Sequence, residues 1–412
     1  MSPDDLMAGR TGRHCLALPS NRLGLYLALR HWCAPGQRLL MSPISADEIL
    51  FLVLAAGLRP VIAPLSPADG NIDPGAVDLD AVDAVLTTNL YGLPDRVAAF
   101  AGKPVIEDVA HAIETTVDGR PLGTFGVAGI YSLSKHPGAG SGGVIAVEHE
   151  SDLRTLERER DRLLLPRAFL GEVHSVLTSM ARHAALRLRL VRPALRLSRS
   201  LGLEEEREGY RIAPRPDDVR LALKQVPDLP AFDSWVQADL HDYRTRRSRL
   251  SCWYQSRRLR ALSGQRERRI AGVRLLAELP TAAAAVRDHR DQPLFRVPLL
   301  VSDRDAAVAE LERHGVATGY LYDPPYDDYL PEFTEASPAP AVARWWGRHV
   351  LPIDPLYARR ALPVVRSSPR PRPSARSVHP SQQFREDHDP RLTWAREAEP
   401  YPRTRPCRLG GP

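Results

Sequence analysis

Tyr131-Ser-Leu-Ser-Lys-His-Pro-Gly-Ala-Gly-Ser-Gly-Gly143 places a lysine between an apolar run and a cluster of glycines. Lysine is rare in this chain, because only Lys103, Lys135 and Lys224 are lysines among the 56 basic residues. Arginine can supply charge at most surfaces, whereas an amine can lose its proton in a dry site and attack a carbonyl. Lys135 is therefore a candidate catalytic residue, with a solvated loop charge or a phosphate contact as the alternatives.

Short apolar runs alternate with helical patterns through the first 150 residues. This alternation predicts an α/β fold with a mainly parallel sheet. Ser20 and Asn21 provide a helix start, and segments 46–57 and 95–101 also suit helices. The strand-like runs cover residues 38–41, 59–63, 84–88, 104–107, 127–131 and 143–147. We expect the strands at 127–131 and 143–147 to lie side by side, with the Lys135 loop between them.

The length of 412 residues allows a large domain and a smaller one. We predict a large domain over residues 10–260, with a helical insertion at about 151–201. A small C-terminal α/β domain is expected over 261–365, with a strand at 295–301 and a helix at 303–315. Residues 366–412 are rich in proline and arginine, which favours a disordered tail.

Composition narrows the class of protein. No run of about 18 apolar residues is present, and the first residues lack the order of a signal peptide, so we expect a cytoplasmic protein without a transmembrane segment. Four scattered cysteines predict neither disulfides nor a metal site. The net charge of +6 would attract anions such as nucleic acid or nucleotide-linked metabolites. The arginines of 184–198 are more typical of a helix with one packed face, and no nucleic-acid partner is expected.

Asp108 and His111 follow the strand-like run that ends at Glu107. Ligands bind outside the carboxyl ends of strands in open α/β sheets, and Lys135 lies just beyond another such end. An acid and an amine are therefore expected to converge there. A turn or helix cap remains the alternative for Asp108, and a hydrogen-bonded loop histidine for His111.

These residue types together suit pyridoxal 5'-phosphate (PLP). This cofactor needs a lysine for its Schiff base, a carboxylate beside its pyridine nitrogen, a flat group against its ring and donors for its phosphate. Lys135, Asp108 and His111 can fill the first three roles. The helix start at Ser20 and Asn21 offers free N–H groups to the phosphate. Ser132 and Ser134 can add hydroxyls, or can be ordinary loop residues.

Three blocks of this sequence resemble the core signature of the DegT/StrS sugar aminotransferases. The blocks are Val105-Ile-Glu-Asp-Val-Ala-His-Ala112, Gly119-Arg-Pro-Leu-Gly-Thr-Phe-Gly126 and the lysine stretch that ends at Gly143. The order and spacing of three blocks are more specific than a single glycine motif. The resemblance is good over about residues 10–150 and patchy to about 362.

The resemblance implies a fold type I PLP enzyme, with a seven-stranded mixed sheet, a smaller C-terminal α/β domain and a homodimer whose sites lie at the subunit boundary. Lys135 would be the Schiff-base lysine and Asp108 the partner of the pyridine nitrogen. His111 would lie against the ring, and Ser132 would bind the phosphate together with Ser20 and Asn21. The family usually moves an amino group from glutamate to a keto group on a nucleotide-linked sugar.

Departures from the family pattern leave the substrate open. The chain has Arg22 after Ser20 and Asn21, where the family commonly has Ser-Gly-Thr. Arginines in the range 244–260 are candidates for substrate anions. Tyr320 and Tyr322 can line the pocket, although a packing role is more typical of such residues. One alternative is another fold type I PLP enzyme, a lyase, dehydratase or desulfurase, although a lysine rather than a histidine at position 135 argues against the sugar dehydratases. The other is a non-catalytic relative that binds the cofactor or an anionic partner for regulation.

Overall fold

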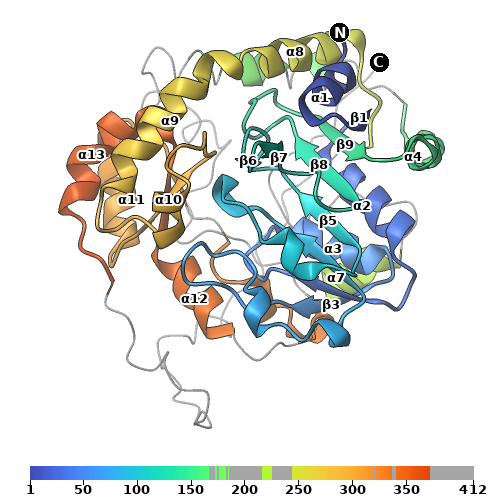
Figure 1. Ribbon diagram of the computed structural model, residues 1–412, viewed down its shortest axis with the longest axis horizontal. Coiled ribbons are helices and arrows are strands. Elements are labelled where there is room, and N and C mark those ends of the chain that lie inside the picture. Colours follow the sequence, from blue (N-terminus) through green and yellow to red (C-terminus); the bar gives the residue numbers. More distant parts are fainter. Residues whose placement is uncertain are drawn as a thin grey trace, which may run out of the picture. The chain divides into compact units, whose positions relative to one another are not determined.

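The computed structural model describes residues 1–166, 172–173, 176–181, 184, 216–224, 244–319, 322–335 and 340–371. All of them belong to one compact unit, Met1–Arg372, whose elements are labelled in Figure 1. About half of the predicted insertion at 151–201 and most of the predicted tail lie outside the described residues. The predicted division at residue 260 stays a prediction. No described helix is long and apolar enough to span a lipid bilayer.

A seven-stranded mixed sheet forms the centre of the N-terminal part. Its strand order is β1-β9-β8-β5-β4-β2-β3. The pairs from β3 to β8 are parallel, whereas β9 is antiparallel to both β8 and β1. The carboxyl ends of β4, β5 and β8 therefore meet at one edge of the sheet. The strands are β1 (His14–Leu18), β2 (Arg38–Met41), β3 (Arg59–Ile62), β4 (Ala84–Thr87), β5 (Val105–Asp108), β8 (Ala128–Ser132) and β9 (Gly143–Val147).

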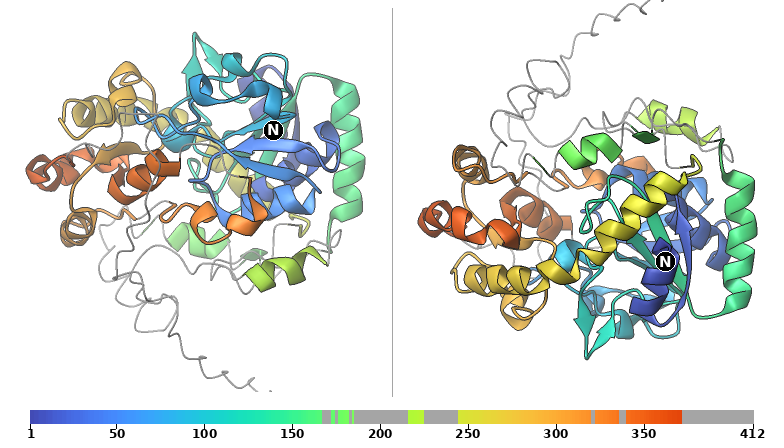
Figure 2. Two further views of the ribbon diagram at one scale, coloured as in Figure 1. Left: turned by 90° about the horizontal axis from the view of Figure 1, so that it is seen from below. Right: turned by 90° about the horizontal axis from the view of Figure 1, so that it is seen from above.

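Helices cover both faces of this sheet (Figures 1 and 2). Because successive strand residues point to opposite faces, Ile145 packs with the helices of one face and Val144 with those of the other. The first face carries α2 (Asn21–Trp32), α3 (Asp47–Ala55), α4 (Glu150–Leu163) and α7 (Pro216–Leu223). The second carries α1 (Pro3–Thr11) and α8 (Arg249–Arg260). The core thus has three layers, and the sheet is buried on both sides.

Helix α2 begins where the sequence predicts it. Ser20 is its N-cap, and Ser20 Oγ accepts a hydrogen bond of 3.2 Å from the Leu23 N–H. Seven consecutive residues from Leu23 to Leu29 are buried, so this helix is apolar nearly all round and packs under the sheet. Its N-terminus lies beside the carboxyl ends of the strands, where Asn21 contacts Asp108 at the end of β5.

A second, smaller α/β part follows α8. Strands β10 (Val297–Leu300) and β11 (Val350–Ile353) pair antiparallel. Their core is shared with Leu90 and Tyr91 of the N-terminal part, so the two parts pack through one continuous apolar cluster. The helices around this pair are α9 (Ser263–Ala277), α10 (Ala284–Asp288), α11 (Arg304–Arg313), α12 (Pro340–His349) and α13 (Ala358–Ser367).

Short elements complete the described part of the chain. Strands β6 (Thr116–Val117) and β7 (Arg120–Pro121) form a small hairpin. The 3-10 helices are η1 (Pro74–Ala76), η2 (Leu79–Ala81), η3 (Leu90–Gly92), η4 (Val97–Phe100), η5 (Tyr326–Asp328), η6 (Pro331–Phe333) and η7 (Pro355–Tyr357). The helix expected at 95–101 is therefore only the short turn η4. Residues 316–319 form no strand, and Tyr320 lies outside the described residues.

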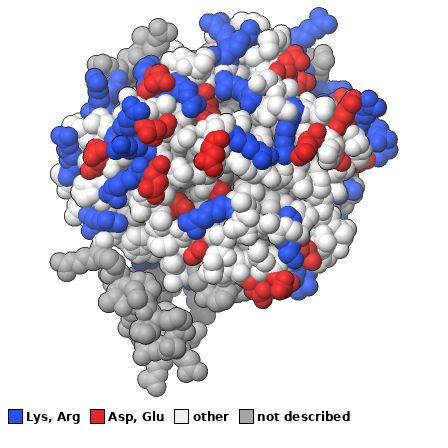
Figure 3. All heavy atoms as spheres, viewed as in Figure 1, with Lys and Arg blue, Asp and Glu red and all other residues white. Residues whose placement is uncertain are grey.

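Charges of both signs are interspersed on the face shown in Figure 3. On α9, for example, Arg274 pairs with Asp291 at 2.7 Å across two exposed side chains. Such exposed pairs contribute at most about 1 kcal/mol to stability. The arginine excess is thus partly compensated on this face by acidic neighbours.

Candidate active site

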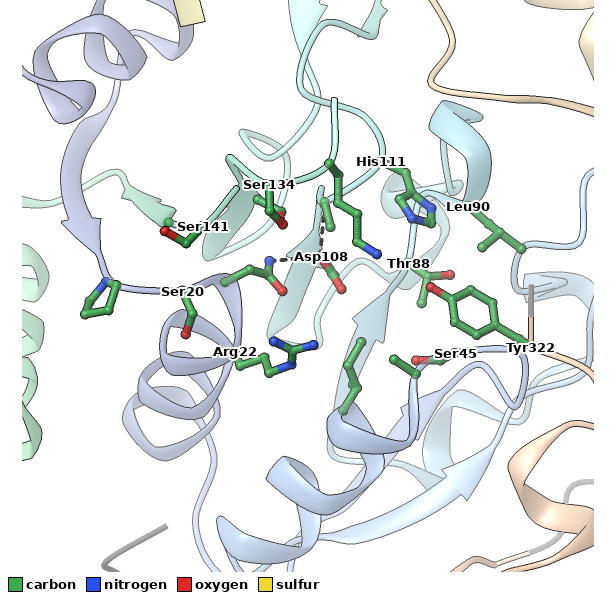
Figure 4. Close-up of a pocket in the computed structure, with 18 of the residues that line it drawn as sticks. Ser20, Arg22, Ser45, Thr88, Leu90, Asp108, His111, Ser134, Ser141 and Tyr322 are labelled. Carbon is green, nitrogen blue, oxygen red and sulfur yellow. Dashed lines mark hydrogen bonds between the residues drawn. The ribbon is translucent and has the colours of Figure 1, made fainter. Parts of the chain in front are cut away.

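A cavity of about 380 Å³ opens at the carboxyl ends of β4, β5 and β8, beside the start of α2. The six residues predicted to form a site all line it (Figure 4). They are Ser20, Asn21, Asp108, His111, Ser132 and Lys135. Three strands, one helix start and one hairpin loop therefore contribute to a single cavity, as expected for the switch region of an open α/β sheet.

The loop with Lys135 connects the antiparallel strands β8 and β9 and leaves Lys135 exposed at the cavity. Glycines allow the loop to approach α2 closely. A Cβ added to Gly143 would lie 2.6 Å from the backbone N of Asn21, and Gly142 has φ +105°. Ser20 forms a parallel bridge with Gly142. The loop and the helix start are thus held against each other, which fits the glycine cluster seen in the sequence.

Asp108 ends β5 and is 5% exposed. Its Oδ1 accepts hydrogen bonds from the Ala110 N–H at 3.0 Å and from Asn21 Nδ2 at 3.3 Å. Burial raises the pKa of Asp108 to about 6, an effect opposed by these hydrogen bonds and by the charges of Lys135 and Arg22. The site therefore favours a cation next to this carboxylate. Asn21 is predicted as a phosphate ligand at the helix start, and its side chain donates to Asp108.

The imidazole ring of His111 stacks on an aromatic ring and is uncharged at neutral pH. Its ring stacks on Phe295, with centroids 4.9 Å apart and planes inclined by 20°. The Tyr91 N–H donates to Nδ1 at 3.4 Å, which leaves the ring proton on Nε2. Burial lowers the pKa of His111 to about 3, and the positive charges of Lys135 and Arg296 add to this effect. His111 can therefore present an uncharged ring to a ligand.

Hydroxyl groups gather on the α2 side of the cavity. Ser132 Oγ and Ser134 Oγ are 3.0 Å apart, and Figure 4 shows Ser20, Ser134 and Ser141 on this side. The Ser20 hydroxyl accepts from the Leu23 N–H, so the contribution of Ser20 is to cap the helix whose first N–H groups face the cavity. Together these donors suit an anion such as a phosphate.

Among the other lining residues, Arg22, Ser45 and Thr88 were not predicted as site residues, whereas Arg247 is one of the arginines in the range 244–260 that are candidates for substrate anions. Arg22 donates to Glu48 Oε1 at 3.1 Å, which holds its guanidinium at the cavity wall. Arg247 lies in the arginine-rich range and donates to the Pro19 carbonyl at 3.3 Å. Arg22 stood out in the sequence only as a departure from the family pattern. Nothing in the sequence marks Thr88 as a site residue, because threonine is common in strands. Tyr322, for which the sequence left both pocket lining and packing open, lines the cavity.

The strand order and the lysine hairpin define the class of fold. It is the α/β fold of fold type I PLP enzymes, and it matches the sugar aminotransferase CalS13 from Micromonospora echinospora with a TM-score of 0.58. The sequences are 20% identical, and the match covers 89% of this chain and 91% of that chain. The predicted fold class is thus confirmed.

Residues 7–159 match the DegT/DnrJ/EryC1/StrS aminotransferase family. The spore coat polysaccharide biosynthesis protein SpsC of Bacillus subtilis (strain 168) is 31% identical over 152 residues, which are 34% of this chain and 39% of that protein. The L-glutamine:scyllo-inosose aminotransferase of Streptomyces griseus is 27% identical over 146 residues, 32% and 34% of the two chains. The match therefore spans about two-fifths of these relatives or less.

Proposed function

We propose that the cavity binds PLP through Lys135 and that the protein transfers an amino group from glutamate or glutamine to a keto group of a sugar or cyclitol. The observation that supports this best is that Lys135 and Asp108, an amine and a buried carboxylate, line one cavity. The S. griseus relative has L-glutamine and scyllo-inosose in its name. A nucleotide-linked keto sugar is the other acceptor class that we propose.

The side chains of the cavity fit PLP. The family is PLP-dependent, and each chemical feature of this cofactor has a counterpart among the lining residues. Lys135 supplies the amine, Asp108 the carboxylate and His111 the flat ring. The phosphate would be held by Ser132, Ser134 and the first N–H groups of α2. The close approach of Gly143 to Asn21 keeps this end of the cavity narrow.

When bound, PLP supplies a conjugated ring that accepts the electron pair released as a proton leaves the carbon bearing the amino group. Asp108 would accept a hydrogen bond from the protonated pyridine nitrogen. Burial raises the pKa of Asp108 to about 6, and a cation at this position would lower it, so the carboxylate would be ionised at neutral pH. Asn21 and the Ala110 N–H keep its Oδ1 in place.

Lys135 would hold the cofactor and, when released by the incoming amine, would move the proton with its Nζ. His111 would pack against the ring without adding charge, because its pKa is lowered to about 3. Arg22 and Arg247 are the described lining arginines that can bind the carboxylate of the amino donor. We also propose a homodimer with its sites at the subunit boundary, as the family resemblance implies.

Visible absorbance of the purified protein tests this proposal. Wild type incubated with PLP should become yellow, lose the colour with L-glutamate or L-glutamine, and regain it with an acceptor. The acceptor panel consists of scyllo-inosose and a UDP-linked 3-keto-N-acetylglucosamine. Lys135→Ala should stay colourless after removal of free PLP. Lys103→Ala and Lys224→Ala are matched controls that should behave like wild type, and a wild type that stays colourless would refute the proposal.

A further inference from the structure

Thr88 carries a hydroxyl that has no partner among the described residues. It follows β4, lines the cavity and is 8% exposed, and its Oγ1 is buried without a hydrogen bond. A buried hydroxyl that makes no hydrogen bond has lost its bonds to water without a replacement. The desolvation of the Thr88 hydroxyl therefore costs stability that a valine of the same shape would not lose. This points to a ligand atom as the missing hydrogen-bond partner.

The backbone that carries Thr88 is fixed by buried hydrogen bonds. Asp95 Oδ2 accepts from the N–H groups of Thr88 and Asn89, at 2.9 and 3.0 Å. Asn89 has φ 43° and ψ 51°, a left-handed conformation that turns the chain sharply after Thr88. Asn89 Nδ2 donates to the Asp108 carbonyl at 3.3 Å, which ties the ends of β4 and β5 together. The Thr88 hydroxyl is therefore positioned relative to Asp108 before any ligand binds.

The surroundings of Thr88 separate it from the phosphate end of the cavity. Figure 4 shows Thr88, Leu90 and Tyr322 on one side of Asp108 and Ser20 and Ser141 on the other. Leu90 is 1% exposed, Tyr322 is 8% exposed and Ser45 is 2% exposed, so the Thr88 side is shielded from water and carries hydroxyl as well as apolar groups. A neutral hydroxyl in such a place suits a neutral oxygen better than a carboxylate, which the arginines of the cavity would bind.

We propose that Thr88 is a specificity-determining residue whose Oγ1 hydrogen-bonds a hydroxyl or keto oxygen of the acceptor ring. This inference rests on the proposed function. A hydroxyl can both donate and accept, so it can pair with either kind of oxygen. A site built to pair with a substrate oxygen discriminates strongly against molecules that lack it, because the buried partner is then left unpaired. Thr88 would thus select for oxygen-rich keto rings.

Thr88→Val tests the inference, because valine keeps the shape and removes the hydroxyl. Its thermal unfolding midpoint without ligands should equal or exceed that of wild type, since no hydrogen bond is lost. The buried Thr115 offers a contrast: its Oγ1 donates to the Gly92 carbonyl at 2.9 Å, so Thr115→Val should lower the midpoint. A lower midpoint for Thr115→Val, without a decrease for Thr88→Val, would show that the Thr88 hydroxyl is unpaired in the ligand-free protein.

The kinetic arm uses the acceptor panel with L-glutamine as donor. For Thr88→Val, kcat/KM for the acceptor that wild type uses should fall at least about tenfold, while PLP affinity and the colour loss with L-glutamine stay unchanged. Thr88→Ser, which retains a hydroxyl, should recover most of the loss.

Three results would overturn the inference. The first is an unchanged kcat/KM for the acceptors, and the second is a weaker PLP affinity in Thr88→Val, which would assign the hydroxyl to the cofactor. The third is a wild type that responds to L-glutamine and uses no acceptor of the panel. The proposed function fails separately, by a wild type that shows no colour with PLP or no colour change with the donor.

Discussion

Phe295 stacks on His111 with ring centroids 4.9 Å apart, although the two residues belong to different parts of the chain. His111 follows β5, whereas Phe295 lies just before β10. Gly92 makes room for this contact, because a Cβ there would lie 2.9 Å from the Phe295 N and 3.1 Å from the His111 carbonyl oxygen. A residue of the C-terminal part thus helps to orient the ring of His111, which belongs to the N-terminal part.

Removal of the Phe295 ring should loosen His111. An aromatic pair contributes about 0.5–1.5 kcal/mol beyond the area it buries, so Phe295→Ala should weaken PLP binding by up to about tenfold. Phe295→Tyr keeps the stack and serves as the matched control. Titration of PLP followed by visible absorbance measures both. Equal PLP affinities of the alanine and tyrosine variants would contradict a role of the stack.

Asp108 should give stability an unusual pH dependence. Burial raises its pKa to about 6 from 3.8, so the folded protein holds this proton more tightly than the unfolded chain does. Without PLP, the free energy of unfolding should fall as pH rises from about 4 to about 6, on the order of 2–3 kcal/mol from this group. Above pH 6 the loss is complete.

The matched variant is Asp108→Asn, which cannot ionise. Asp95, with its pKa also raised to about 6, contributes equally in both proteins, so the difference between their profiles isolates Asp108. We expect the variant without PLP to be at least as stable as wild type near pH 7 and to bind PLP more weakly. Urea unfolding at several pH values measures the first, and parallel profiles for the two proteins would refute the expectation.

The ion pair between Arg22 and Glu48 allows a test of donor binding. Arg22→Gln should raise KM for L-glutamine or L-glutamate about tenfold or more, because a charge-assisted hydrogen bond to a carboxylate contributes about 1.5–3 kcal/mol. The single variant leaves the 6% exposed Glu48 without its partner and should be less stable. The double variant Arg22→Gln with Glu48→Gln should regain stability but keep the high KM. Recovery of a normal KM in the double variant would exclude this role of Arg22.

Gly143 should tolerate no side chain. Gly143→Ala places a Cβ 2.6 Å from the Asn21 N, and the backbone must shift at a cost of about 1–3 kcal/mol. The shift would move the start of α2 and weaken PLP binding. Gly9→Ala in α1 is the control, because it meets nothing within 4 Å and alanine favours helix. Thermal unfolding should show a decrease for the first and none for the second; a stable Gly143→Ala would contradict the close packing.

Periodicity and turn residues were sufficient to locate six strands of the sheet. Runs such as 38–41 and 143–147 coincide with β2 and β9, because buried strands are short, apolar and bounded by turn residues. The seventh strand, β1, was not located from its residues. His14–Leu18 is exposed at its first residue and half-buried at others, so its pattern is weak, and pairing with β9 rather than local preference makes it a strand.

The sequence was sufficient to predict that Lys135 and Asp108 line one site, because both lie at strands whose carboxyl ends share one edge of the sheet. It was not sufficient to predict the direction in which individual side chains point. Asn21 lies at the expected helix start, yet its amide donates to Asp108, a contact between residues distant in sequence. The unpaired state of the Thr88 hydroxyl depends on everything packed around it, and no local pattern encodes that.

The bridge between Ser20 and Gly142 joins the start of α2 to the end of the lysine loop. The loop leads into β9, and β9 pairs with β1, which lies at the sheet edge and directly precedes α2. The end of the cavity where we place the cofactor phosphate is therefore held together through β1 and β9. Disruption of β1 should therefore weaken PLP binding, although none of its residues lines the cavity.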